Sequence, residues 1–230
     1  KAEFELVLSP IKTTFKKYPN YSFDDLSKDF YSEREMVYEG RVNADGYSRI
    51  NINLGEPNNA PGALNARFLG KVFEEGGDFS ISNVSMPYYP YSTFVGVKTP
   101  EGDKRGIILT DKDHAIRIAS VDADGNPINR RNVKVQLFKL DWKWWWDNSY
   151  DAISNYVGRS YRDPIKEGFV DTNNGEGSWN LRIDYPQWGR YFVRVEDPIS
   201  GHSAGQVVYI DWPGWAGKGK RGELGGSSML

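Results

Sequence analysis

The chain has 230 residues, of which 39% are hydrophobic and 26% are charged, so it is long enough for one or two domains with a packed core. Its formal net charge of −2 gives no reason to expect nucleic-acid binding, and no apolar run approaches the roughly 18 residues of a membrane span. The absence of cysteine excludes disulfides, zinc–thiolate sites and thiol catalysis.

Short strands dominate the first half of the sequence. Alternating or apolar-rich patterns predict strands at residues 4–8, 34–42, 47–54, 63–74 and 78–84. The Asp45-Gly46 pair between two of these runs predicts a hairpin over residues 34–54. Gly70 predicts a bulge or bend, and residues 86–91 are too rich in proline for a central strand. Residues 94–97 are the candidate for a strand that closes this first sheet.

The second half repeats this scheme. Strands are predicted at residues 114–121, 133–139, 178–184, 188–196 and 205–210, with a single local helix at 149–156. The alternation is most regular in 188–196, where Tyr191, Val193 and Val195 share one face. A glycine two residues before such a tyrosine is typical of late strands in immunoglobulin-like sandwiches, in which the tyrosine packs at a corner.

These patterns predict an all-β chain of two tandem immunoglobulin-like antiparallel β-sandwiches, residues 1–98 and 106–213, joined by polar, turn-forming residues. The phrase Val-Asn-Ala-Asp-Gly that ends at Gly46 is echoed by Val-Asp-Ala-Asp-Gly that ends at Gly125, which favours two similar halves. Residues 214–230 are rich in glycine and lysine, and we expect a linker into a following domain of a longer protein.

Four close tryptophans, Trp142, Trp144, Trp145 and Trp146, are the most unusual local feature. An aromatic side chain buries about 150–250 Å², so exposing four together is costly. We therefore expect them to fill the sandwich core or to pack between domains. An aromatic platform for sugar rings, or a surface for a partner, is the alternative.

The C-terminal tail carries three close basic residues, Lys218, Lys220 and Arg221, among glycines. A flexible segment of this kind is readily cut by trypsin-like proteases. An interdomain linker is the favoured interpretation, and a bait-like cleavage site is the alternative.

No residue pattern predicts a cofactor or a metal site. Asp122, Asp124 and Asn126 resemble a cation loop, but Gly125 and the proline after Asn126 break the spacing that calcium requires. Residues 171–177 fail for the same reason. Both segments are expected to be plain turns between strands.

The sequence also predicts no catalytic residue. His114 and His202 are the two histidines, and they come from opposite ends of one predicted domain. No Gly-x-Ser-x-Gly motif accompanies them, so a catalytic triad is not indicated. We expect His202 to lie in a tight turn before the last strand.

Several phrases over nearly the whole chain resemble bacterial alpha-2-macroglobulins. They are Lys139-Leu-Asp-Trp-Lys-Trp-Trp-Trp146, Trp188-Gly-Arg-Tyr-Phe-Val-Arg-Val195, Gly76-Gly-Asp-Phe-Ser80, Tyr88-Tyr-Pro-Tyr91, Phe94-Val-Gly-Val97, Gly201-His-Ser-Ala-Gly205 and Trp212-Pro-Gly-Trp215. Their order resembles consecutive macroglobulin domains from the middle of that family. The phrases are structural rather than catalytic.

The resemblance implies a large protease trap, in which a target protease cuts a bait segment and the molecule rearranges around it. Many members then capture the protease through an internal thioester between a cysteine and a glutamine, which this cysteine-free chain cannot form. The resemblance further implies a periplasmic, lipid-anchored envelope protein linked to a penicillin-binding protein. Its partners would be the neighbouring domains and the target proteases.

The sequence thus predicts a non-catalytic pair of structural modules from a protease-trapping, endopeptidase-inhibiting envelope protein. The alternative is a carbohydrate-binding or adhesive pair of β-sandwiches, which the tryptophans favour. An enzyme is the least favoured of the three classes.

Overall fold

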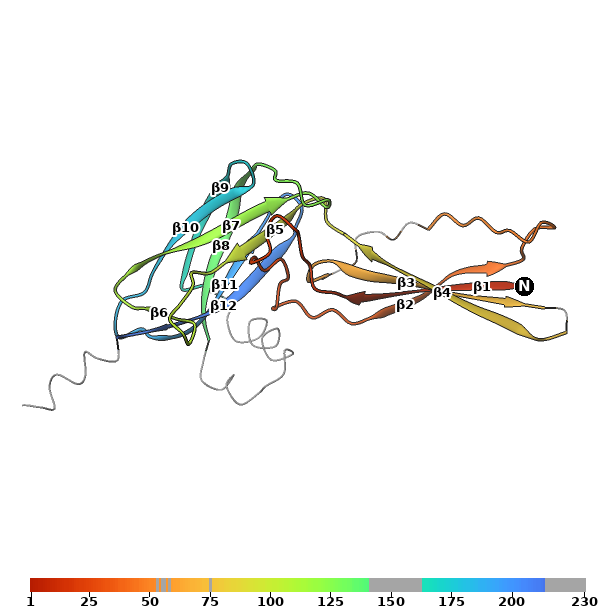
Figure 1. Ribbon diagram of the computed structural model, residues 1–230, viewed down its shortest axis with the longest axis horizontal. Coiled ribbons are helices and arrows are strands. Elements are labelled where there is room, and N and C mark those ends of the chain that lie inside the picture. The colour runs from red at the N-terminus through yellow and green to blue at the C-terminus, as the bar shows by residue number, and fades with distance from the viewer. Residues whose placement is uncertain (53, 55–56, 58, 75, 141–162, 214–230) are drawn as a thin grey trace, which may run out of the picture.

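The computed structural model describes residues 1–52, 54, 57, 59–74, 76–140 and 163–213, which form twelve strands (Figure 1). The strands are β1 (Ala2–Pro10), β2 (Glu33–Gly40), β3 (Leu64–Phe73), β4 (Phe79–Tyr88), β5 (Phe94–Lys98), β6 (Ile107–Leu109), β7 (Asp113–Val121), β8 (Arg130–Leu140), β9 (Lys166–Thr172), β10 (Glu176–Arg182), β11 (Gly189–Glu196) and β12 (Ser203–Asp211). The predicted all-β fold class is confirmed.

The C-terminal part is a sandwich of two sheets. One sheet has the order β10-β7-β5, and the other has the order β6-β12-β11-β8-β9. All neighbouring strands are antiparallel except β6 and β12, which are parallel. Two faces of alternating apolar residues meet between the sheets, because each strand turns every second side chain inward.

The core of this sandwich follows from that alternation. Its buried members include Val97, Ile116, Ile118 and Leu181 from the smaller sheet, and Val133, Val135, Leu137, Tyr191, Val193, Val195, Val208 and Ile210 from the larger one. Tyr191 is fully buried, and its hydroxyl donates a hydrogen bond to the carbonyl of Gln187. Burial raises the pKa of Tyr191 to about 12. The predicted tyrosine corner is therefore present.

The N-terminal part is a four-stranded antiparallel sheet with the order β2-β1-β3-β4. Figure 1 shows this sheet projecting from the sandwich. One face carries a small core of Leu6, Leu8, Ala60, Leu64 and Ala66. Strand β4 forms one edge of the sheet, and all its residues except Tyr88 are exposed. Among the described residues, no second sheet covers this one.

Two sequence-based expectations for this sheet are wrong. The turn at Asn43–Gly46 forms, with the Asn43 amide donating to the Tyr47 carbonyl over 2.8 Å and Gly46 at φ 81°. The described residues after it form no strand, and β2 pairs with β1 instead. Gly70 makes no bulge, since β3 pairs in unbroken register, and it allows the ring of Phe4 to approach closely.

Strand β5 does not close the first sheet. It pairs with β7 and belongs to the sandwich, so the sandwich begins by Phe94 rather than after residue 105. Residues 86–88 extend β4 despite Pro87, which an edge strand tolerates. The predicted strands near 114–121, 133–139, 178–184, 188–196 and 205–210 match β7, β8, β10, β11 and β12. The helix predicted at 149–156 lies outside the described residues.

Candidate functional site at the junction of the two parts

The connection between β1 and β2, residues 11–32, leaves the four-stranded sheet and packs against the sandwich. Ser22 and Val97 exchange two backbone hydrogen bonds of 2.9 Å, which adds a short bridge to the open edge of β5. The Gly205 amide donates to the Asp24 carbonyl over 2.9 Å, and the Ser22 hydroxyl donates to the Gly205 carbonyl over 3.1 Å. The connection therefore bonds to both sheets of the sandwich.

Aromatic side chains fill the contact beneath this connection. The cluster comprises buried Phe15, Tyr18, Phe23, Phe94, Ala119 and Val121. Phe23 is fully buried and meets the ring of Phe15 edge-on, with 4.8 Å between centroids. A Cβ on Gly96 would lie 2.5 Å from the Phe23 ring, so the glycine is what lets the ring rest on β5.

Asp25 is the fully buried anion of this junction. Its Oδ2 accepts a hydrogen bond from Arg194 Nε at 2.8 Å and one from the Ser203 hydroxyl at 2.6 Å. Its Oδ1 accepts from the Ser27 amide at 2.9 Å and the Ser27 hydroxyl at 2.5 Å. Four donors thus satisfy both oxygens, as a buried carboxylate requires.

The charges of this pair are stabilised by each other. Burial alone would raise the pKa of Asp25, but the Arg194 guanidinium and the hydroxyls of Ser203 and Ser27 outweigh it and hold the pKa below its ordinary value. Burial would likewise lower the pKa of Arg194, and Asp25 and Glu196 reverse that effect. The pair is therefore ionised, and losing one partner would leave an uncompensated buried charge.

Arg194 lies on the outer face of the larger sheet, beside an apolar contact. Phe192, two residues earlier, is fully buried there with Phe138 and Leu140, and Leu26 of the connection packs against them. A Cβ on Gly205 would overlap the Phe192 ring. The outer face of β11 is thus shaped to receive the connection, with an apolar contact next to an ion pair.

His202 is fully buried where β12 begins and bonds to both parts of the molecule. Its Nδ1 lies 3.0 Å from the Val95 amide nitrogen, and its Nε2 lies 3.1 Å from the Phe23 carbonyl oxygen. The Val95 amide must donate, so Nδ1 is the acceptor and Nε2 carries the proton toward Phe23. Burial, with a contribution from the Lys28 charge, lowers the pKa of His202 to about 3. The imidazole is therefore a neutral bridge.

The turn before His202 is held by a second buried carboxylate. Asp197 accepts from Arg130 Nε at 3.0 Å and from the Ser200 hydroxyl at 2.9 Å, and the guanidinium of Arg130 also donates to the Thr93 hydroxyl. Backbone hydrogen bonds of 2.9 Å join Asp197 to Gly201 and His202. The predicted tight turn is confirmed, and it fixes His202 in position.

Asp24 ties the connection back to the four-stranded sheet. Its carboxylate accepts from the Thr13 amide at 3.1 Å and the Thr13 hydroxyl at 2.5 Å. Thr13 Oγ1 in turn accepts from the Ala63 amide at 2.7 Å, one residue before β3. Burial raises the pKa of Asp24, opposed by the Thr13 hydrogen bonds. Neighbouring residues Asp24 and Asp25 thus hold opposite parts of the molecule.

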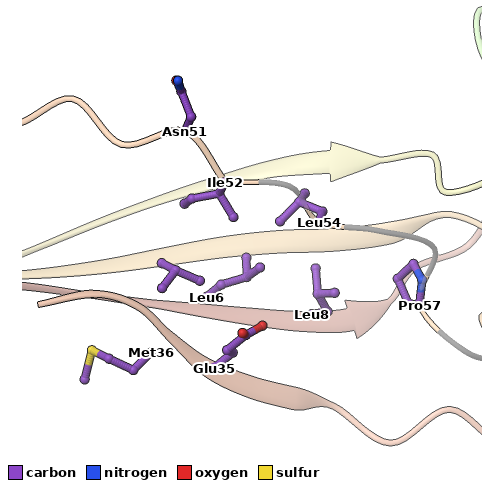
Figure 2. Close-up of a pocket in the computed structure, with 9 residues that line it drawn as sticks. Leu6, Leu8, Glu35, Met36, Asn51, Ile52, Leu54 and Pro57 are labelled. Carbon is purple, nitrogen blue, oxygen red and sulfur yellow. The ribbon is translucent and has the colours of Figure 1, made fainter.

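Ile52 and Leu54, which follow the Asn43–Gly46 turn, cover one face of β1 (Figure 2). Their side chains are directed toward Leu6 and Leu8. The cavity between them has a volume of about 270 Å³, and Glu35 also lines it. The lining of this cavity combines apolar side chains with the carboxylate of Glu35. At the junction, by contrast, both oxygens of Asp25 accept hydrogen bonds.

The polar residues that the sequence singles out make hydrogen bonds to nearby backbone groups. Asp122 is the acceptor in a turn, taking hydrogen bonds from the Asp124 and Asn126 amides at 3.0 and 2.8 Å. His114 is on strand β7, and its Nε2 lies 2.7 Å from the carbonyl oxygen of Leu109 on β6. In the described part of the chain no three His, Cys, Asp or Glu side chains gather as metal ligands, and no helix could span a membrane.

The two sets of sites that the sequence emphasises most lie outside the described residues. They are Trp142, Trp144, Trp145 and Trp146, and Lys218, Lys220 and Arg221. Sequence reasoning missed Asp25 and Arg194. Arg194 is one of three charged residues of β11, so nothing local singled it out, and its partner lies 169 positions away.

Comparison with known proteins gives one family model and several solved structures that are similar to this chain. The model of the bacterial macroglobulin domain 6 family matches residues 96–212. A trypsin-activated alpha-2-macroglobulin from Escherichia coli is similar in structure, with a TM-score of 0.55 and 15% identity over 93% of this chain. A Salmonella alpha-2-macroglobulin reacted with methylamine gives a TM-score of 0.49 and 14% identity over 92% of the chain.

The chain spans 14% of the length of each of these two structures, and comparison with curated protein sequences gives no match. At 15% identity, the likeness to the Escherichia coli structure shows the fold alone. The family match covers the last three of the five residues of β5 and all of β6 to β12, which is most of the sandwich that receives the β1–β2 connection. This chain belongs to the bacterial macroglobulin domain 6 family.

Proposed function

We propose that this chain is a structural module of a bacterial alpha-2-macroglobulin-like protease trap, and that it holds neighbouring parts of that protein in a fixed arrangement. The observation that carries this proposal is the buried junction around Asp25, Arg194 and His202. Both oxygens of Asp25 and both ring nitrogens of His202 have hydrogen-bond partners within the chain, and the cavity of about 600 Å³ beside Asp25 is lined also by Lys12, Lys28 and Tyr31. A site built this way suits the maintenance of an orientation, not the turnover of a substrate.

Trapping is proposed for the whole protein and not for these 230 residues. Enclosing a protease requires a cage larger than one sandwich and one sheet, and covalent capture through a thioester requires a cysteine that is absent. We place the whole protein in the cell envelope, in the periplasm and on a lipid anchor. Its partners are its own further domains and the proteases that it captures. Residues 214–230 serve as the linker to the next domain.

The experiment is an inhibition assay with the purified chain and trypsin at equimolar ratio, read out as hydrolysis of a protein substrate. The expected result is trypsin activity equal to that without the chain. Inhibition at equimolar ratio would overturn the proposal. Hydrolase activity that disappears in His114→Ala or His202→Gln would also overturn it.

A second candidate function, sugar binding, is favoured by a group of exposed aromatic rings. Tyr185, Trp188 and Trp212 are between 39% and 60% exposed, and the Trp212 ring lies 5.4 Å from Trp188 and 5.9 Å from Tyr185 between centroids. Aromatic faces near water stack on sugar rings. Glycan-array binding that Trp188→Ala abolishes without lowering the melting temperature would establish this function, and an array without signal would dismiss it.

A further inference from the structure

Lys28, in the β1–β2 connection, is a partly buried cation whose hydrogen-bond acceptors are neutral. Its Nζ donates to the Tyr91 hydroxyl at 3.2 Å and to the Ala60 carbonyl at 3.4 Å, and it lies 5.3 Å from the centre of the Tyr91 ring. In the part of the chain that the structure describes, Lys28 forms no ion pair, and no acceptor lies opposite the third N–H of its ammonium.

The nearest negative charges are already engaged by other groups. Asp25 is bound to Arg194 Nε at 2.8 Å, and Asp24 accepts the Thr13 hydroxyl at 2.5 Å. Burial lowers the pKa of Lys28, and the attraction of Asp25 opposes this effect while the positive charge of Arg194 adds to it. A charge removed from water is stable when an opposite charge pairs with it. The ammonium of Lys28 therefore favours an added anion.

A cavity of about 600 Å³ gives such an anion room beside Lys28. Sites for small organic molecules have volumes of about 300–1,000 Å³ and combine many apolar side chains with a few polar groups. Lys12 brings a second positive charge to the lining. The apolar side chains of the lining are those of Pro10, Ile11, Leu26, Phe30 and Pro61.

The acidic residues of the lining limit the charge of a ligand. Asp24 and Asp29 line the cavity together with Asp25. A ligand with two negative charges would meet repulsion from these carboxylates, whereas a single negative charge is matched by Lys28 and Lys12. The lining therefore suits one carboxylate attached to an apolar body.

We propose that this cavity binds an organic monocarboxylate, with the carboxylate on the ammonium of Lys28 and the apolar part against Ile11, Leu26 and Phe30. The hydrogen bond between the two charged groups satisfies the third N–H of Lys28. Because Pro10 belongs to β1 and Leu26 to the connection, a bound ligand contacts both and adds to the contacts at the junction. This binding activity goes beyond the structural function proposed for the module.

Titration of the purified chain with three ligands of similar length, followed by NMR, tests the required charge. Hexanoate should bind saturably. Hexanamide, which has no charge, and adipate, which has two, should each bind about tenfold more weakly or less, because a hydrogen bond between charged groups is lost or repulsion is added. No saturable binding of hexanoate would overturn the proposal. Equal binding of hexanamide would overturn the role of the ammonium.

Lys28→Met tests the residue, because it keeps an unbranched side chain and removes the charge. Hexanoate should bind this variant about tenfold more weakly or less. Lys16→Met, the matched control, changes an exposed lysine of the same connection outside the cavity lining and should bind hexanoate as the unchanged chain does. The melting temperature of Lys28→Met should not fall, since an unpaired, partly buried charge is removed. A large fall would show that the chain already satisfies this ammonium, and it would overturn the proposal.

Two sources can supply the same carboxylate, a free organic acid or the C-terminus of a peptide. The dipeptide N-acetyl-leucyl-alanine with a free C-terminus separates them in the same titration. Tighter binding of the dipeptide than of hexanoate would assign the cavity to a chain end, and the reverse order would assign it to a free acid. Equal binding of the dipeptide and its C-terminal amide would contradict recognition of the carboxylate.

Discussion

Arg194 and Asp25 form an ion pair of 2.8 Å between residues 169 positions apart, one on the sandwich and one on the segment that joins β1 to β2. The contact joins the two parts of the molecule through buried groups rather than through a surface loop. Its neighbours, Ser203, Ser27 and Glu196, leave neither charge without a partner. The orientation of the four-stranded sheet is therefore tied to the stability of the sandwich.

The ion pair predicts a large cost for removing one partner. Asp25→Ala should lower the free energy of unfolding by about 3–5 kcal/mol, because Arg194 would lose the buried carboxylate at its Nε and keep only Glu196, at its Nη1, as an anionic partner. The Asp25→Leu/Arg194→Met double variant should lose less than Asp25→Ala alone, since no buried charge remains. Urea denaturation followed by tryptophan fluorescence measures both.

The matched control for Asp25→Ala is Arg182→Ala. Its guanidinium contacts Asp184 at 2.8 Å, but both side chains are exposed. Exposed pairs contribute about 0–1 kcal/mol, so this variant should unfold close to the unchanged chain. Equal losses for Asp25→Ala and Arg182→Ala would contradict the role given to the junction.

His202 predicts a specific dependence of stability on pH. Its pKa is about 3 in the folded chain and about 6.5 in the unfolded chain, so the unfolded state binds the proton first as pH falls. The stabilising contribution is complete above pH 6.5 and declines below it, by roughly 2–3 kcal/mol between pH 6.5 and 4.5. Denaturation curves over this range measure the slope.

The His202→Gln variant separates titration from packing. A glutamine amide offers one acceptor and one donor for Val95 and Phe23 and does not titrate in this range. The variant should therefore show a flatter stability curve between pH 6.5 and 4.5 than the unchanged chain. An unchanged slope in His202→Gln would show that other groups cause the acid sensitivity.

Gly205 is predicted to be intolerant of a methyl group. Gly205→Ala should lower the free energy of unfolding by about 1–3 kcal/mol, because the added Cβ would displace the buried Phe192 ring. Gly76→Ala, which meets no atom within 4 Å, should stay within about 0.5 kcal/mol of the unchanged chain. Thermal denaturation of the two variants measures both changes. Similar losses of unfolding free energy in both would contradict the steric explanation.

The tail predicts the site of first proteolysis. Limited trypsin digestion should cut near Lys218 to Arg221 before any other position, because glycine-rich sequence with few apolar residues is the preferred substrate of proteases. Mass spectrometry of early digests should show a body ending at one of these residues. Early cleavage within β7 to β12 would contradict the prediction.

The sequence predicts most strands of the sandwich because apolar and polar residues alternate along them. Tyr191, Val193 and Val195 define an inward face by themselves, and the corner glycine marks where the strand begins. The assignment of β5 fails for the opposite reason. Val95 and Val97 belong to a short, wholly apolar run, and such a run carries no information about which sheet it joins.

The predicted hairpin and the junction also depend on contacts between residues far apart in the sequence, which local patterns do not predict. The Asn43–Gly46 turn forms as its local chemistry dictates, yet Ile52 and Leu54 cover β1 instead of pairing with β2. His202 looks like an ordinary turn residue until Phe23, 179 positions earlier, is placed beside it. Long-range polar contacts of this kind have no sequence period, so pattern reasoning cannot find them.

The central claim is that the junction holds the four-stranded sheet and the sandwich in one orientation. Spin labels on Arg67→Cys of β3 and Ser178→Cys of β10, both exposed positions, would report the distance between the two parts. Pulsed electron paramagnetic resonance, with labelled chain diluted in unlabelled chain, should give one narrow distance distribution that broadens when Asp25→Ala is added. A broad distribution before Asp25 is changed would contradict the claim.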